Sequence, residues 1–130
     1  MAEDTVYLGL RTMLASSTAF VALVPMDRVR PFGKLKQNET LPAVTLFRLS
    51  ARRWPGYGRE SGHADVQVQL DVYGTTERQT LDVAEQVRLA LQNQSQGSIR
   101  GTFLNTERDW YEDQSESFRI LQQWNIHHAE

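Results

Sequence analysis

The sequence predicts an α+β domain: an antiparallel sheet of about four strands, with the N-terminal and central helices packed on one face. One stretch, 64–92, holds a complete strand, a sharp stop and a complete helix. The elements follow the order helix, strands, helix, strands, which lacks the strand–helix alternation of a parallel sheet. The 130 residues are 40% hydrophobic and 23% charged, as in an ordinary globular domain. We therefore expect a single domain over residues 1–130.

The stretch 64–92 is the most regular part of the sequence. Its first half alternates polar residues with Val66, Val68, Leu70 and Val72. This alternation predicts a strand with one buried face. We expect Gly74 to end the strand because glycine tolerates backbone angles that other residues resist. Thr76 then caps a helix, and Gln79 completes a capping box. The apolar stripe of this helix consists of Thr80, Val83, Ala84, Val87, Ala90 and Leu91. We expect the stripe to pack on the apolar face of the strand.

The remaining elements are assigned from the same two periodicities. Residues 27–32 predict a short extended piece, which Pro31 restricts to a sheet edge. The other expected segments are helices at 3–15 and 19–24, a loop at 33–41, and strands at 42–50, 99–110 and 117–128. The first helix has an apolar stripe of Val6, Leu10, Met13 and Leu14. One face of the last strand carries Phe118, Ile120, Trp124 and Ile126, with Gln122 as a polar exception.

Residues 51–63, ARRWPGYGRESGH, contain three glycines, a proline and three arginines and show no periodicity. These signals predict a long, flexible hairpin loop between two strands, and such a loop in a compact domain is usually functional or disordered. We expect it to be mobile in an isolated subunit and ordered against a partner, because its glycines raise the entropy of the free loop. Its arginine and aromatic residues suit either nucleic acid or protein contacts. Protein contacts are favoured because the net charge is only −2. The residues are Arg52, Arg53, Trp54, Tyr57 and Arg59.

The strand at 42–50, PAVTLFRLS, has apolar residues on both sides. This indicates burial on both faces, or burial on one face and a partner on the other. Phe47 and Leu49 share one side, where exposure to water would be a liability for a monomer. Tyr73 adds aromatic surface beyond the evident needs of a small core. We expect these three side chains to contact a neighbouring subunit or another partner.

The charges are unevenly distributed along the chain. Residues 1–65 carry nine Lys/Arg and six Asp/Glu, which gives +3, and residues 66–130 carry five and ten, which gives −5. This asymmetry suits head-to-tail contacts between identical subunits, each offering a basic edge to an acidic one. A solvated surface that happens to be uneven explains it equally well.

Residues suited to catalysis or metal binding do not form a recognisable set. The chain has no cysteine, so disulfides and thiolate metal sites are excluded. His127 and His128 are adjacent in a predicted strand and point to opposite faces. Ser61 near His63 has no identifiable orienting acid. An acidic cluster could serve acid–base work or hold a cation, but a solvated turn explains it better. The cluster consists of Glu107, Asp109, Glu112, Asp113 and Glu116. We expect no metal, no cofactor and no enzymatic activity. We also expect no membrane partner, because no apolar run approaches the roughly 18 residues of a membrane span.

Four passages in order resemble the tail completion, or tail terminator, proteins of long-tailed bacteriophages, prophages and related phage-like particles. They are FVALVPMDRVRP, LPAVTLFRLS, ADVQVQLDVYGTTERQTLDVAEQVRLAL and ERDWYEDQSESFRILQQWNIHH. The third is similar to the family's most recognisable stretch, a VQ(I/L)DVY strand followed by a helix. The passages span nearly the whole chain, although DRVRPFGKLKQ is a looser match and RRWPGYG has no fixed family pattern.

The resemblance implies a structural role without catalysis. Such proteins form a ring, commonly of six subunits, at the head-proximal end of the virion tail. The ring ends tail-tube polymerisation and joins the tail to the head connector. The implied partners are further copies of the chain, the tail tube protein and the head connector protein. Genomic DNA passes through the lumen without sequence-specific binding. Such a protein is made in the host bacterial cytoplasm. The alternatives are a head–tail adaptor or stopper ring protein of the connector and, from another class, a small ligand-binding module or enzyme.

Overall fold

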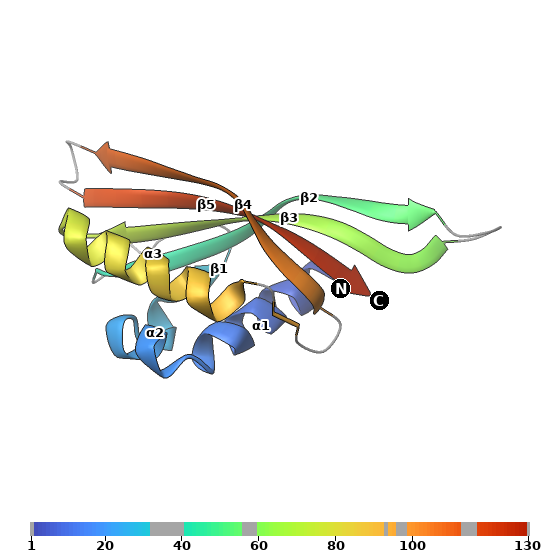
Figure 1. Ribbon diagram of the computed structural model, residues 1–130, viewed down its shortest axis with the longest axis horizontal. Coiled ribbons are helices and arrows are strands. Elements are labelled where there is room, and N and C mark those ends of the chain that lie inside the picture. Colours follow the sequence, from blue (N-terminus) through green and yellow to red (C-terminus); the bar gives the residue numbers. More distant parts are fainter. Residues whose placement is uncertain are drawn as a thin grey trace.

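The structure is a computed structural model that describes residues 2–31, 41–55, 60–92, 94–95, 99–112 and 117–129. Within these residues a five-stranded sheet carries its helices on one face (Figure 1). The helices are α1 (Ala2–Ala15), α2 (Thr18–Leu23), the 3-10 turn η1 (Met26–Arg28) and α3 (Glu77–Leu91). The strands are β1 (Val29–Pro31), β2 (Ala43–Pro55), β3 (Glu60–Gly74), β4 (Ile99–Glu112) and β5 (Ser117–Ala129). The predicted α+β class is confirmed.

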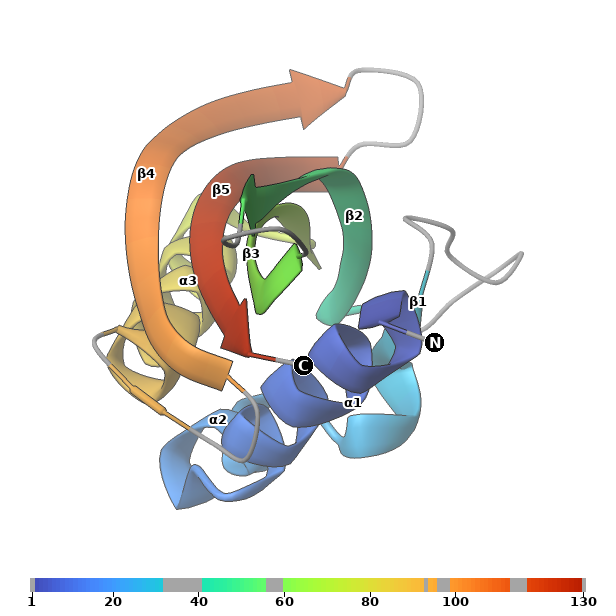
Figure 2. The ribbon, with the colours of Figure 1, turned by 90° about the vertical axis from the view of Figure 1, so that its right-hand side faces the viewer.

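The strand order across the sheet is β1-β2-β3-β5-β4. The four long strands pair antiparallel, and β1 pairs parallel with β2 over Val29–Pro31 and Val44–Leu46. The short extended piece at 27–32 therefore supplies a fifth strand, at the edge where Pro31 was expected to place it. Viewed along its length, the sheet is strongly bent, and α1 and α2 lie against one side (Figure 2).

The core lies between the helices and the sheet. The predicted stripe of α1 is buried, with exposed fractions between 0% for Leu14 and 7% for Met13. The apolar face of β3 and the predicted face of α3 are buried against each other, and Ala90 is partly buried beside them. Trp124 is 0% exposed, so it packs the domain itself. The periodicities read from the sequence thus identify the core correctly.

The junction of β3 and α3 differs from the prediction in two details. Thr76 caps α3, and its Oγ1 accepts from the Gln79 N–H at 3.1 Å. The Gln79 Oε1, however, accepts from the Thr75 N–H at 2.9 Å, so the reciprocal bond of the capping box goes to the residue before the cap. Gly74 does not have the positive φ that favours glycine. It is needed because a Cβ there would collide with Thr80 Oγ1 and lie 3.2 Å from the Thr80 backbone nitrogen.

The prediction of a loop at residues 51–63 is wrong for most of that range. The ladder between β2 and β3 continues to Pro55↔Glu60, so residues 51–55 and 60–63 are strand. Register shifts after Arg48 and after Arg53 absorb the irregular sequence, and antiparallel pairing continues past them. The hairpin of β2 and β3 projects at the right of Figure 1, past the last β3–β5 pair at His63↔Ala129. Residues 56–59 and most of the loop predicted at 33–41 lie outside the described residues.

Candidate functional site

The face of the sheet away from the helices is largely polar. In the centre of this face β3 contributes Asp65, Gln67, Gln69, Asp71 and Tyr73. The residues paired with them on β5 are His127, Asn125, Gln123, Leu121 and Arg119, in the same order. Because paired residues point to the same side of an antiparallel sheet, these ten side chains share one surface. It is the predicted polar face of the central strand, extended across a second strand.

An ion pair between a buried aspartate and a half-buried arginine lies at one end of this polar face. Asp71 is 0% exposed, and its two oxygens accept from Arg119 at 2.6 Å and from Gln69 Nε2 at 2.9 Å. The Arg119 guanidinium also lies 5.2 Å from the centre of the Tyr73 ring, within cation–π range. Both oxygens of the buried carboxylate therefore have a donor. Tyr73, expected at an interface, already contacts a side chain of its own subunit. Nothing in the sequence indicated this pair, because its two residues lie 48 positions apart.

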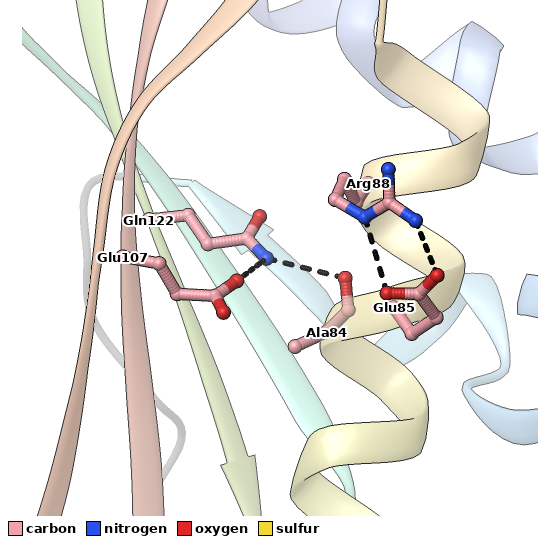
Figure 3. Close-up of polar contacts among 5 residues, drawn as sticks. All are labelled: Ala84, Glu85, Arg88, Glu107 and Gln122. Carbon is pink, nitrogen blue, oxygen red and sulfur yellow. Dashed lines mark hydrogen bonds and ion pairs between the residues drawn. The ribbon is translucent and has the colours of Figure 1, made fainter.

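A second polar network joins α3 to the sheet. Gln122, the predicted polar exception of the last strand, is 0% exposed. Its Nε2 donates to the Ala84 carbonyl at 3.1 Å and to Glu107 Oε2 at 2.7 Å (Figure 3). Its Oε1 accepts from Trp124 Nε1 at 3.0 Å. Glu107, from the predicted acidic cluster, thus binds a neighbouring strand of its own subunit, which is a structural role.

Next to this network, Arg88 and Glu85 form an ion pair on the outer surface of α3 (Figure 3). The side-chain hydrogen bond from Arg88 lowers the pKa of Glu85 below its ordinary value of 4.5. The hydrogen bond and charge of Glu85 raise the pKa of Arg88, and the charge of Glu107 raises it further. The pair is exposed, so solvent screens it and it has little weight in stability.

A shallow depression of about 250 Å³ lies beside the start of α3. Glu77 and Asp109 line it, together with Thr80, whose hydroxyl donates to the Thr76 carbonyl at 2.7 Å. A second depression, of about 300 Å³, lies between the ends of α1 and α3, where Met13, Ser16, Leu89 and Gln94 line it. Both volumes are at or below the ~300 Å³ at which ligand pockets begin. Among the described residues, no three His, Cys, Asp or Glu side chains come close enough to hold a metal ion.

The predicted interface residues spread along β2 and β3 instead of forming one cluster. Tyr73 pairs with Ala43 at one end of β2, and Arg52 pairs with Asp65 towards the other. Phe47 is half-buried, Leu49 is 41% exposed at the register shift, and Arg52 is exposed. Arg53 and Trp54 lie in β2, but their side chains are outside the description, as are Tyr57 and Arg59 altogether.

The strand at 42–50 has two different halves. Ala43, Val44, Thr45 and Leu46 are all buried, with 0–2% exposure. Burial on both faces, one of the two predicted alternatives, therefore holds for this half. From Phe47 onward the strand is half-buried or exposed. The exposed half is also the part of β2 that β1 does not cover.

Both edges of the sheet keep long stretches of strand that no other described strand pairs with. The outer edge of β4 has no such neighbour along Ile99–Glu112, and that of β2 has none beyond Leu46, where β1 ends. Phe103 on β4 is 53% exposed. Unpaired edges present backbone N–H and C=O groups to a partner strand. Each helix in the described part of the chain falls short of the length and hydrophobicity that spanning a bilayer requires.

The described residues form a small α+β domain with a largely polar sheet face and two sheet edges that no described strand fully covers, and such surfaces suit contacts with other proteins. The sequence matches the model of the family "Tail completion protein gp17" over residues 9–128. The chain belongs to that family and is a structural protein of bacteriophage tails. The predicted resemblance to tail completion proteins is thereby confirmed. Among curated proteins, none matches the sequence.

Solved structures resemble the fold at low sequence identity. A chain from the virion of a native gene transfer agent particle superposes with a TM-score of 0.78 at 13% identity, covering 96% of this chain and 95% of that one. Two chains from Akkermansia muciniphila give TM-scores of 0.34 and 0.37 at 12% and 9% identity. They cover 65% and 68% of this chain and 44% and 42% of their own, and scores this low carry no argument.

Proposed function

We propose that the chain forms a homomeric ring, a hexamer, at the head-proximal end of a phage tail, where it ends tube polymerisation and joins the tail to the head connector. The observation that carries this proposal is the family match over residues 9–128. The similar fold of a chain from a gene transfer agent virion, covering nearly all of both chains, supports it. The protein acts without catalysis, and the tail tube and head connector proteins are its partners.

The shape of the domain suits this role. The two sheet edges that no described strand fully covers lie on opposite sides of one sheet, so each copy can bind one neighbour at each edge. Such heterologous contacts between identical subunits close into a ring when the rotation allows it. DNA passes through the lumen without sequence-specific binding. The lumen need not be basic, because many phosphate contacts would hold the DNA instead of letting it slide.

The test is deletion of the gene in the phage that encodes the chain, followed by electron microscopy. We expect tails of abnormal length that do not join heads, restored by supplying the protein. Tails of normal length that fail to attach would assign the chain to a head–tail adaptor instead. A single copy at the head–tail junction of intact particles would rule out the ring.

The role of the β2–β3 hairpin is tested separately by substituting Arg52, Arg53 and Trp54 together with alanine. We expect a folded subunit that fails to end tails normally or to join them to heads, because arginine and tryptophan commonly dominate protein contacts. The matched control replaces Arg78 and Asp82, an exposed ion pair on α3, and leaves the particles unchanged. Normal length and infectivity in the triple variant would remove the hairpin from the mechanism.

A further inference from the structure

We propose that copies of this chain join edge to edge, with the outer edge of β4 in one copy pairing antiparallel with the outer edge of β2 in the next. The inference rests on the proposed ring and specifies its subunit contact. The partner is a second copy of the chain, and the contact forms without a third protein.

The extent of the contact follows from β1. Since β1 pairs with Val44–Leu46, a neighbouring strand can pair with β2 only from Phe47 towards Pro55. This leaves nine residues of edge on β2, and β4 offers fourteen on the other side of the sheet. β1 therefore acts as a stop that limits how far the neighbour slides along β2.

The strand directions also fit. The three ladders β2–β3, β3–β5 and β5–β4 are all antiparallel, so β4 runs opposite to β2. A rotation about an axis roughly parallel to the strands keeps the direction of β2 in the next copy. The β4 of one copy and the β2 of the next are then antiparallel, which continues the alternation across the boundary.

The register of the contact follows from rows of paired residues. One row contains Arg48, Val68, Trp124 and Leu104, and the row two residues away contains Leu46, Leu70, Gln122 and Glu107. Strands of a closed barrel tilt and stagger relative to one another. A stagger of two residues places Arg48 of one copy opposite Glu107 of the next copy. A stagger of four residues places Arg48 opposite Asp109. Even staggers also keep the helix-covered faces of both copies on the same side.

Opposite charges favour these staggers. β2 carries Arg48, Arg52 and Arg53 and no acidic residue. The second half of β4 carries Glu107, Asp109 and Glu112 against one arginine, Arg108. Arg48, Glu107 and Asp109 are exposed, and opposite charges directly across a strand pair stabilise it, whereas like charges destabilise it. In each of the two staggers one arginine, Arg48, therefore faces one carboxylate, that of Glu107 or Asp109.

Cysteine cross-linking tests the contact, since the chain has no cysteine of its own. Two double variants of the full chain are made, Arg48→Cys with Glu107→Cys and Arg48→Cys with Asp109→Cys. Within one copy, β2 and β4 are separated by three strand spacings, about 14 Å along the sheet. That exceeds the roughly 7 Å limit between the Cα atoms of a disulfide, so a bond must join two copies. The control, Arg48→Cys with Asp82→Cys, has its second thiol on the exposed surface of α3.

Each purified variant is oxidised at high concentration and low salt, and its oligomers are separated without reductant. We expect at least one edge pair to form a ladder of covalent oligomers roughly tenfold faster than the control, because an aligned contact holds the thiols together. Edge variants that are seen as rings by electron microscopy but cross-link no faster than the control would overturn the edge contact. The proposed ring itself would then still stand. Variants that remain monomeric and uncross-linked would overturn the contact too, because it is proposed to form unaided. Cross-linked open filaments, with no ring in particles, would support the edge contact and end the proposed ring.

Discussion

Replacing Gln122 with leucine is expected to destabilise the domain, although leucine is apolar and similar in size. Gln122 and Trp124 are both 0% exposed, so water does not replace a bond lost between them. The Gln122 amide makes three hydrogen bonds of 2.7–3.1 Å, to the Ala84 carbonyl, to Glu107 and from the Trp124 indole. The amide is therefore buried with its partners in place, the condition under which a buried polar network stabilises a fold.

The size of the stability loss in Gln122→Leu follows from the polar groups that leucine leaves without a hydrogen-bond partner. The indole N–H of Trp124 loses its acceptor inside the core, and a buried donor without a partner costs about 1–3 kcal/mol. Glu107 is exposed, so water replaces its lost donor. Removing the amide also removes its own need for partners, which offsets part of the cost. We expect a net loss of about 1–2 kcal/mol in the free energy of unfolding, or about 4–8 °C in Tm for a chain of this size.

Urea unfolding followed by circular dichroism, at one low protein concentration, measures this loss. The control is Gln123→Leu, the same change one residue along on the opposite face, which should alter stability little. Adding Trp124→Phe removes the unpaired N–H, so the double variant should lose less stability than the sum of the two single changes, by about 1 kcal/mol. Additive losses, or a Gln122→Leu protein as stable as the wild type, would refute the reasoning.

Two further substitutions test the structure away from this network. Gly74→Ala should lower the free energy of unfolding by about 1–3 kcal/mol, because the new Cβ collides with Thr80. The control is Gly101→Ala, whose Cβ meets its nearest atom at 3.4 Å. Equal losses of stability for the two variants in urea unfolding would contradict the collision. Glu85→Gln should have its full effect above about pH 4.5, the ordinary pKa of this carboxyl. The pKa is lowered in the fold, so the contribution of the Arg88 pair is present above that pH and is lost as pH falls through the folded pKa. The difference in Tm between Glu85→Gln and wild type should be small, vanish in acid and shrink with salt; a difference that grows in acid would contradict the sign.

The elements that were predicted correctly are those whose residue patterns lie within a single short segment of the chain. The stripe of α1, the Thr76 cap and the buried face of β3 all follow from residues a few positions apart, where helix and strand periods act. Even Gln122 was recognisable as a polar interruption of an apolar face. Its role was not, because that role depends on Ala84 and Glu107, which belong to other elements.

The features that were missed depend on which strands become neighbours. Asp71 and Arg119 are 48 residues apart and meet only because β5 lies beside β3. In the sequence, each is an ordinary polar residue on the polar side of a strand. The hairpin at 51–63 was misread for a related reason. Glycine and proline predict a loop from the local sequence alone, whereas the ladder with β3, which tolerates two register shifts, determines the backbone there.

A contact between sheet edges would be hidden from sequence patterns for a related physical reason. A period of two reports which face of a strand is buried, because side chains alternate between the two faces. The edges of a strand are made of backbone N–H and C=O groups, which every residue except proline carries in full. Whether an edge is open depends on strand order, and here the order leaves β4 and half of β2 without a described neighbour. From the sequence alone, only the charges of such edges can be recognised, as a basic first half and an acidic second half of the chain. That asymmetry suits complementary subunit surfaces, and the proposal that those surfaces are the edges of β2 and β4 rests on the strand order.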